Sequence, residues 1–156
     1  MANVTPGFTY QSTTALTAAN LNLLGQPTVT IGTGEVTNAM LASSGGIGYV
    51  TGTGGTVTQA TSKSTGVTLN KACGQITMHN AALAADTTVS FVLTNSVIAA
   101  GDVLILNHIS GGTAGSYTLN ARSASGSATI DVRNVTAGSL GEAIVIAYAV
   151  IKAVTS

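Results

Sequence analysis

Charged residues are scarce in this chain. Among its 156 residues, five are Lys or Arg and five are Asp or Glu, 6% of the sequence, whereas globular proteins average about 25%. A formal net charge of zero leaves no basic surface to neutralise phosphates, so nucleic acid is not expected as a partner. Weak electrostatic repulsion also favours association. We therefore expect an obligate oligomer, or part of a larger assembly, whose uncharged surface is covered.

Cysteine and long apolar runs are equally sparse. Cys73 is the only cysteine, so no disulfide can form within the chain, and we expect it to be a small buried filler. Residues Met1–Tyr10 lack the basic and apolar regions of a secretory signal. The most apolar stretch, Ala143–Ile151, is far shorter than the roughly 18 to 20 residues that span a bilayer. We expect no membrane partner and interpret this stretch as a buried strand.

Patterns for catalysis and metal binding are missing too. His79 and His108 are the only histidines, and neither has carboxylates or thiols at the spacing of a three- or four-ligand metal site. We expect each to be hydrogen-bonded at a strand end or subunit contact, with a ring of histidines about a symmetry axis as the alternative. No G-x-S-x-G elbow occurs. We therefore expect no enzymatic activity, no cofactor and no metal site.

The glycine runs and the few charges predict two local features, turns and an ion pair. The runs at Gly45–Gly55 and Ile109–Gly115 precede strand patterns rather than a phosphate-binding helix, so we interpret them as hairpin turns that use positive φ. Asp131 and Arg133 stand two residues apart on the outer face of one expected strand. We expect them to form an ion pair that stabilises the fold by under about 1 kcal/mol.

Residues 1–46 differ in texture from the rest and are expected to form an extended arm. Thr17 is a candidate cap for a short helix, with Leu16 and Leu21 at hydrophobic-staple spacing and Gly25 then Pro27 ending it. A weaker second turn is expected at Ala39–Leu41. So short a helix is not stable alone in water, so we expect the leucines of the arm to dock on another surface. A partner surface is the simplest account, and an arm swapped between identical subunits is the alternative.

Residues 47–156 are expected to form an all-β domain of eight or nine short strands, the signature of an antiparallel β-sandwich. Apolar and polar residues alternate at Thr88–Leu93, Ser116–Arg122 and Ala128–Asn134, as in strands with one wet face. The stretches Asp102–Ile109 and Glu142–Lys152 are apolar on both faces. Such strands lie in the middle of a sandwich or at a subunit contact.

The last expected strand has two unlike faces. Ile144, Ile146, Tyr148 and Val150 form a bulky face, whereas the opposite face is mostly small. We expect the bulky face to fill the core and the small one to lie toward a neighbouring subunit, the alternative being that it faces a loop of its own chain. The residues of this candidate subunit interface are Ala143, Val145, Ala147 and Ala149.

Four stretches of the chain resemble a domain found in virion proteins of tailed bacteriophages. They are GEVTNAMLA, GTGGTVTQATSKSTGVTLNKACGQITM, VSFVLTNSVIAAGDVLILNHISGGTAGSYTLNARS and RNVTAGSLGEAIVIAYAVIKA. The resemblance covers Ile47–Ser156 well and the arm loosely. It implies a fibre or head-decoration protein, typically a homotrimer with a β-sandwich or jelly-roll domain.

The resemblance implies a capsid decoration or cement protein on the virion surface, assembled in the host cytoplasm. The chain has no heptad stalk and no collagen-like repeat, which favours the head over a long fibre. The implied partners are the chain itself, as a jelly-roll-like trimer, and the major capsid protein. The alternative is a small tail fibre or tip adhesin whose loop Gly111–Ser116 contacts a host glycan; a depolymerase has least support. The arm residues implied to contact the capsid are Phe8, Tyr10, Leu16, Leu21 and Leu24.

Overall fold

The computed structural model describes residues 3–5, 17, 28–30, 48–49 and 51–153. The chain divides into two compact units, Met1–Gly48 and Tyr49–Ser156. In the first unit, strands β1 (Asn3–Thr5) and β2 (Thr28–Thr30) pair antiparallel, with Val4 opposite Val29. The short helix expected after Thr17 and the turn expected at Ala39–Leu41 lie outside the described residues.

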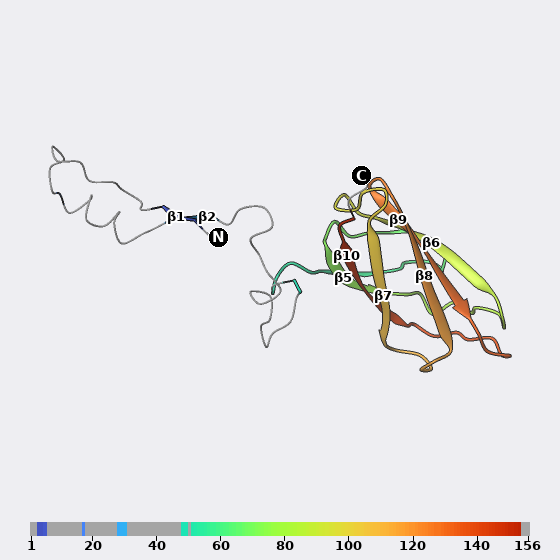
Figure 1. Ribbon diagram of the computed structural model, residues 1–156. Helices are drawn as coiled ribbons and strands as arrows, with labels where there is room; N and C mark the ends of the chain where they lie inside the picture. Colours follow the sequence, from blue (N-terminus) through green and yellow to red (C-terminus); the bar gives the residue numbers. More distant parts are fainter. Residues whose placement is uncertain (1–2, 6–16, 18–27, 31–47, 50, 154–156) are drawn as a thin grey trace. The chain divides into compact units, whose positions relative to one another are not determined.

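The second unit is a β-sandwich-like domain of two four-stranded sheets (Figure 1). The first, sheet B, has the order β3-β5-β10-β7, and the second, sheet C, has the order β4-β6-β9-β8. Eight strands in this domain agree with the expected eight or nine. The strands of sheet B are β3 (Thr56–Thr58), β5 (Cys73–Thr77), β10 (Val145–Ile151) and β7 (Val103–Ser110). Those of sheet C are β4 (Val67–Thr68), β6 (Thr88–Thr94), β9 (Ser127–Asn134) and β8 (Tyr117–Ala124).

The expectation of wholly antiparallel sheets is wrong at two strand pairs. β3 pairs with β5, and β4 with β6, in parallel. The reason is the path of the chain, which passes from one sheet to the other at every step from β3 to β8. Strands that neighbour each other within a sheet are therefore separated by a strand of the opposite sheet, and β3 and β5 run in the same direction. Only β8 and β9 are joined as a tight hairpin, through Ser125 and Gly126, where Gly126 has a φ of 74°.

One hydrophobic core lies between the two sheets, as the alternation predicts. Phe91 and Leu93 of β6 and Ile130 and Val132 of β9 are buried, and the residues between them face outward. From sheet B, the bulky residues of the last strand meet them. Fully buried Ile, Leu and Val side chains each stabilise the fold by about 1.5–3 kcal/mol relative to exposure. The buried members of the core from sheet B are Ile76, Ile146, Tyr148 and Val150, with Ile144 just before β10.

The prediction for the glycine runs is right in part: Gly54 and Gly55 do not have positive φ, and the loop after β7 leads to the other sheet and so is not a hairpin. Gly52, Gly111, Gly112 and Gly115 all have positive φ. At Gly111 a side chain is excluded by space as well, since a Cβ there would stand 2.3 Å from the carbonyl oxygen of Ala143. This close approach fixes the loop after β7 against the chain that leads into β10.

Candidate assembly surface

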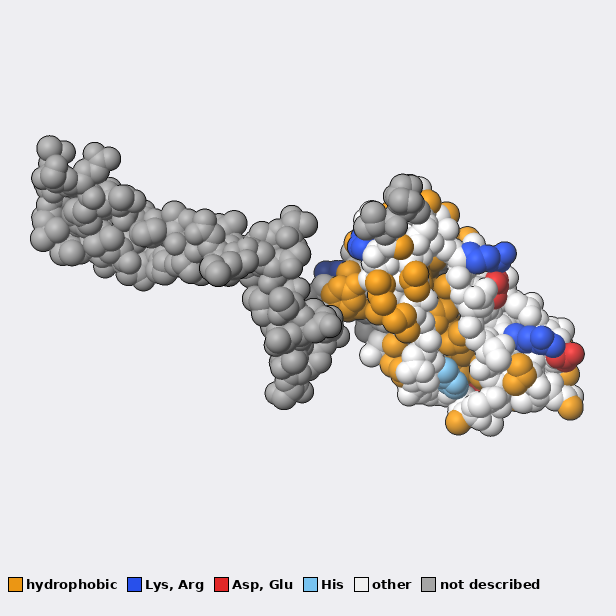
Figure 2. Space-filling view, viewed as in Figure 1, with side chains coloured by type: hydrophobic (Ala, Val, Ile, Leu, Met, Phe, Trp, Pro, Cys, Tyr) orange, Lys and Arg blue, Asp and Glu red, His pale blue; other side chains and the backbone are white. Residues whose placement is uncertain are grey.

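The outward face of sheet B is apolar where β7 meets the end of β10, is polar beside Ala147, where Gln75 and Asn107 lie, and over the described strands carries no charged residue. Val103, Ile105 and Ile151 are each at least half exposed, at 52%, 53% and 50%. The register sets Ile151 opposite Val103 and Ala149 opposite Ile105 on the same face. Figure 2 shows hydrophobic side chains gathered over the part of the domain that holds β5, β7 and β10. Exposed apolar surface of this kind makes the face a candidate interaction site.

The outward face of sheet C has the opposite character. β6 and β9 present Thr, Ser and charged side chains there, with Val92 as the apolar exception. Two ion pairs lie on it: Arg122 with Asp131 at 3.2 Å and Arg133 with Asp86 at 2.5 Å. Figure 2 shows two groups of adjoining positive and negative side chains on the side of the domain away from the main gathering of hydrophobic ones. This face is suited to contact with water.

The expected ion pair between Asp131 and Arg133 is wrong. Asp131 instead accepts from Ser90 Oγ at 2.6 Å and pairs with Arg122, and both interactions cross from one strand to another. The hydroxyl of Ser90, the largest cause, and the nearby guanidinium of Arg122 lower the pKa of the Asp131 carboxyl. Residues two apart on a strand share a face, but cross-strand neighbours are closer, so the sheet pairing decides which charges meet.

Three of the four residues expected at a subunit interface lie on the outward face of sheet B. Val145, Ala147 and Ala149 are partly exposed in the central strand β10. Ala143 precedes the strand and is exposed, and its carbonyl lies against Gly111 of its own chain. Cys73, expected to be a buried filler, is a free and only partly buried thiol opposite Ala149. The arm residues Phe8, Tyr10, Leu16, Leu21 and Leu24 lie outside the described residues.

β7 adds most to this face, and it is the edge strand of sheet B rather than a central one. Its inward residues Leu104 and Leu106 pack against the core, while Val103, Ile105 and Ile109 are exposed. Its apolar character on both faces therefore does not come from burial within the sandwich. Its edge position agrees with the other expectation for a strand that is apolar on both faces, which is a contact with a second subunit.

Just before the N-terminal end of β10, Glu142 holds the loop after β7. Its carboxylate accepts from the backbone N–H of Thr113 at 3.0 Å, from the Thr113 hydroxyl at 2.6 Å and from the Tyr117 hydroxyl at 2.8 Å. The bonds from Thr113, the largest causes, lower the pKa of Glu142, while burial and this carboxylate raise that of Tyr117. A hollow of about 280 Å³ lies beside the loop, lined by His108, Tyr117, the residues from Ile109 to Gly112, and Ala114 and Gly115.

Both histidines are hydrogen-bonded near strand ends. The ring of His108 lies 2.6 Å from the carbonyl oxygen of Gly111 through Nε2, and His79 Nδ1 accepts from the backbone N–H of Ala81 at 3.0 Å. Within the described part of the chain, no group of three or more His, Cys, Asp or Glu side chains is placed to hold a metal ion. The local bonds give each ring a positioning role in its own loop.

A buried lysine is the polar feature that sequence reasoning missed. Lys63 is only 3% exposed, and its ammonium group donates to the backbone carbonyls of His79 and Glu142. Burial lowers the pKa of Lys63, and the carboxylate of Glu142 opposes that shift. Gln59, also buried, donates to the carbonyls of Lys63 and Thr65. The sequence Thr-Ser-Lys-Ser gives no signal of this, because lysine in a polar loop is ordinarily solvated.

Two buried asparagines end the central strands of sheet C. Asn95 and Asn134 are both fully buried, and each accepts from the backbone N–H two residues later. Asn134 also donates to the carbonyls of Leu83, Ala84 and Gly138. This is the Asx turn, and Asn directly after an apolar strand is the signal that would have predicted it.

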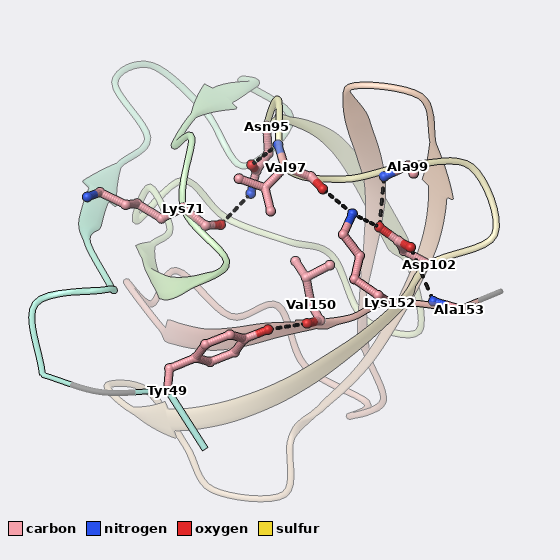
Figure 3. Close-up of polar contacts among 9 residues, drawn as sticks. All are labelled: Tyr49, Lys71, Asn95, Val97, Ala99, Asp102, Val150, Lys152 and Ala153. Carbon is pink, nitrogen blue, oxygen red and sulfur yellow. Dashed lines mark hydrogen bonds and ion pairs between the residues drawn. The ribbon is translucent and has the colours of Figure 1, made fainter. Parts of the chain in front are cut away.

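The two ends of the domain are fastened side by side (Figure 3). The Tyr49 hydroxyl donates to the carbonyl of Val150 near the end of β10. Beyond it, the Lys152 ammonium donates to the carbonyl of Val97 and pairs with Asp102 at 2.6 Å. Asp102 also accepts from the backbone N–H groups of Ala99 and Ala153. The Lys152 bond, the largest cause, lowers the pKa of the Asp102 carboxyl, whose side chain is 2% exposed.

Comparisons with known proteins identify no relative. Among the residues described, no helix is long and apolar enough to cross a membrane. No protein family, curated protein or solved structure matches the chain.

Proposed function

We propose that the protein is a structural subunit of a many-copy assembly, and that the outward face of sheet B joins its copies. The observation that carries this proposal is the contrast between the two outward faces, one uncharged with exposed Val and Ile side chains and the other polar with two ion pairs. Interfaces between identical subunits resemble a domain core cut in half. Val145, Ala147 and Ala149 lie in the centre of this interface, and the small side chains of the two alanines let a second backbone approach.

The assembly that we propose is the head of a tailed bacteriophage, where the protein acts as a capsid decoration or cement protein. Support comes from the resemblance of the sequence to such virion proteins and from its low charge. A homotrimer contacting the major capsid protein through the arm would stabilise the head by multivalent contact rather than by catalysis. The jelly-roll-like description belongs to this proposal: the strand count and the two sheets fit it, whereas the parallel pairs depart from its antiparallel pattern.

Measuring the mass of the purified chain by light scattering tests the assembly directly. We expect a homotrimer for the natural sequence and a monomer for Ala147→Glu, because a carboxylate on this face cannot be buried without a partner. A natural chain that is monomeric at all concentrations would refute the proposal. The copy number per particle then separates decoration, with hundreds of copies, from a tail protein with a few trimers.

The arm is tested on the particle. We expect removal of residues 1–46 to abolish binding to heads while the β-domain stays soluble and oligomeric. Retained binding would show that Phe8, Tyr10 and the leucines of the arm are not the capsid contact.

A tail-tip adhesin is the second candidate, and the hollow beside His108 and Tyr117 favours it. The hollow of about 280 Å³ is open to a sugar ring, and Glu142 fixes the loop that lines it. Binding on a glycan array, lost in Gly115→Asp, would support the adhesin. Cleavage of a polysaccharide would instead indicate a depolymerase.

A further inference from the structure

The loop from β7 to β8 is attached to the rest of the domain through one carboxylate. Residues 111–115 of this loop are all exposed. Within the described part of the chain, the hydrogen bonds of residues 112–115 to groups outside the loop all go from Thr113 to Glu142, from its N–H at 3.0 Å and its hydroxyl at 2.6 Å. One further bond, from the N–H of Ser116 to the Thr113 carbonyl at 3.3 Å, lies within the loop. The Glu142 carboxylate is therefore the polar anchor of this segment.

Glycines stand at both ends of the anchored segment. Gly111, Gly112 and Gly115 have φ of 70°, 63° and 75°, and residues at the ends of elements absorb the backbone rotations of a moving loop. Gly112 lies directly against Glu142 and Ile144, since a Cβ there would stand 2.7 Å from Glu142 Oε2 and 2.6 Å from Ile144 Cγ2. Without a side chain, Gly112 adds little apolar contact of its own, so the bonds of Thr113 decide whether the loop stays closed.

The groups bonded to the carboxylate are neutral donors, so these bonds depend on the charge of Glu142 itself. The third donor is the Tyr117 hydroxyl at 2.8 Å, and burial raises the pKa of Tyr117, so it stays protonated. Lys63 donates to the backbone carbonyls of Glu142 and His79, and no ion pair among the described residues involves Glu142. The ring of His108 meets the Tyr117 ring edge-on, with centroids 5.8 Å apart.

We propose that Glu142 is a charge-dependent latch, whose ionised carboxylate holds residues 112–115 closed and whose protonation releases them about the flanking glycines. A protonated carboxyl adds a donor where three donors already point, and the bonds that remain lose their charge assistance and about half their strength. Gly111, Gly112, Ala114 and Gly115 line the hollow beside His108, so release of the loop also takes this hollow apart. The latch lies within one domain and does not depend on the proposed assembly.

The direction of the pH effect follows from the bonds of the closed loop. The bonds from Thr113, the largest causes, lower the pKa of Glu142 below its ordinary value of 4.5. The carboxylate therefore stabilises the closed loop fully above the ordinary pKa, and this stabilisation is lost as pH falls through the lower pKa of the closed state. The latch is closed at neutral pH and opens in acid.

Nuclear magnetic resonance relaxation of the full-length chain tests the latch at neutral pH. We expect Glu142→Gln to lower the backbone order parameters of residues 112–115 from about 0.85 to below about 0.6, while those of β9 stay unchanged. Asp86→Asn is the control, because it neutralises a carboxylate that is 73% exposed and has no bond to this loop. A loop that stays as rigid in Glu142→Gln as in the natural chain would overturn the proposal.

An acid titration of two Thr113 variants tests the role of charge while keeping Glu142 in place, and it decides the matter if Glu142→Gln does not fold. Thr113→Val removes the hydroxyl that most lowers the pKa of Glu142, so we expect the loop to be released at a pH at least about 0.5 higher than in the natural chain. Thr113→Ser keeps the hydroxyl and should leave the midpoint unchanged. Equal midpoints in the two variants would contradict the latch. So would a natural loop already released at pH 6, which would assign the release to His79 or His108.

Discussion

The two sheets have equivalent inner faces and unlike outer faces. Ile146 of sheet B and Ile130 of sheet C are both fully buried in the same core. On the outside, Ile105 of sheet B is exposed within an uncharged apolar face, whereas the corresponding face of sheet C carries Asp131 and Arg133. The difference teaches that the core alone does not account for the apolar residues of this chain. Part of its hydrophobic content lies exposed on the outside of sheet B.

The largest expected effect comes from placing a charge on each outer face. We expect Ile105→Lys to abolish oligomer formation, because an unpaired ammonium buried between subunits is strongly destabilising. The matched variant Val92→Lys alters a residue on sheet C that is 46% exposed and should leave the mass of the oligomer unchanged. Analytical ultracentrifugation measures both. Equal loss of the oligomer in the two variants would remove the distinction between the faces.

Truncating a core side chain should destabilise the domain to a similar extent on either inner face. Ile146→Ala and Ile130→Ala each create a cavity in the shared core, and we expect each to lower the free energy of unfolding by about 2–5 kcal/mol. Val92→Ala, on the exposed face of sheet C, should change it by no more than about 0.5 kcal/mol. Urea unfolding followed by fluorescence or circular dichroism gives these values. A large difference between the two isoleucine variants would mean that the sheets do not share one core.

A pH-dependent effect is expected at the fastened ends of the domain. The pKa of Asp102 is lowered in the folded state, chiefly by Lys152, so its contribution to stability is present above the ordinary carboxyl pKa of about 4 and is lost as pH falls through the lower folded pKa. We expect Asp102→Asn to destabilise the domain at neutral pH. The difference in unfolding free energy between Asp102→Asn and the natural chain should narrow below about pH 4.

Denaturant unfolding over a series of pH values measures that gap. Asp86→Asn is the control, since the side chain of Asp86 is 73% exposed. A gap for Asp102→Asn that stays constant into strong acid would show that the carboxylate charge is not what holds the chain end.

The smallest effect is expected on the polar face. Arg133 and Asp86 are 51% and 73% exposed, so removing the pair with Arg133→Gln should cost less than about 1 kcal/mol, and added salt should reduce the cost further. Thermal unfolding at low and high salt checks this. A cost above that of the core variants would indicate that this face is buried against another surface.

The inner faces could be predicted from sequence, whereas the partners of the strands could not. Period-two alternation identified Phe91, Leu93, Ile130 and Val132 as core residues because alternation is a local property of a strand. It gives no information on which strand lies beside which, so the parallel edge pairs and the edge position of β7 were not predicted. The pairing of Asp131 with Arg122 was missed for the same reason, since cross-strand neighbours come from distant parts of the chain.

The candidate surface could be predicted in part. The small face of the last strand pointed to Val145, Ala147 and Ala149, which do lie outward, and its placement against a neighbour stays a prediction. Lys63 was not predictable, because its burial depends on the carbonyls of His79 and Glu142, which reach it only in the folded domain. Ala143 was misplaced because the strand begins two residues later, at Val145, and strand boundaries are the least certain part of a pattern.

The bond between Tyr49 and Val150 has a consequence for engineering the molecule. It brings the first and last parts of the domain together at one pole, whereas Gly115, around which a Cβ would meet no atom within 4 Å, lies beyond the other ends of β7 and β10. Neighbouring ends are what circular permutation requires. A short linker from the C-terminus to Tyr49, with new ends opened at Gly115, should give a permuted domain. A protein fused to the new ends would then project from the opposite pole.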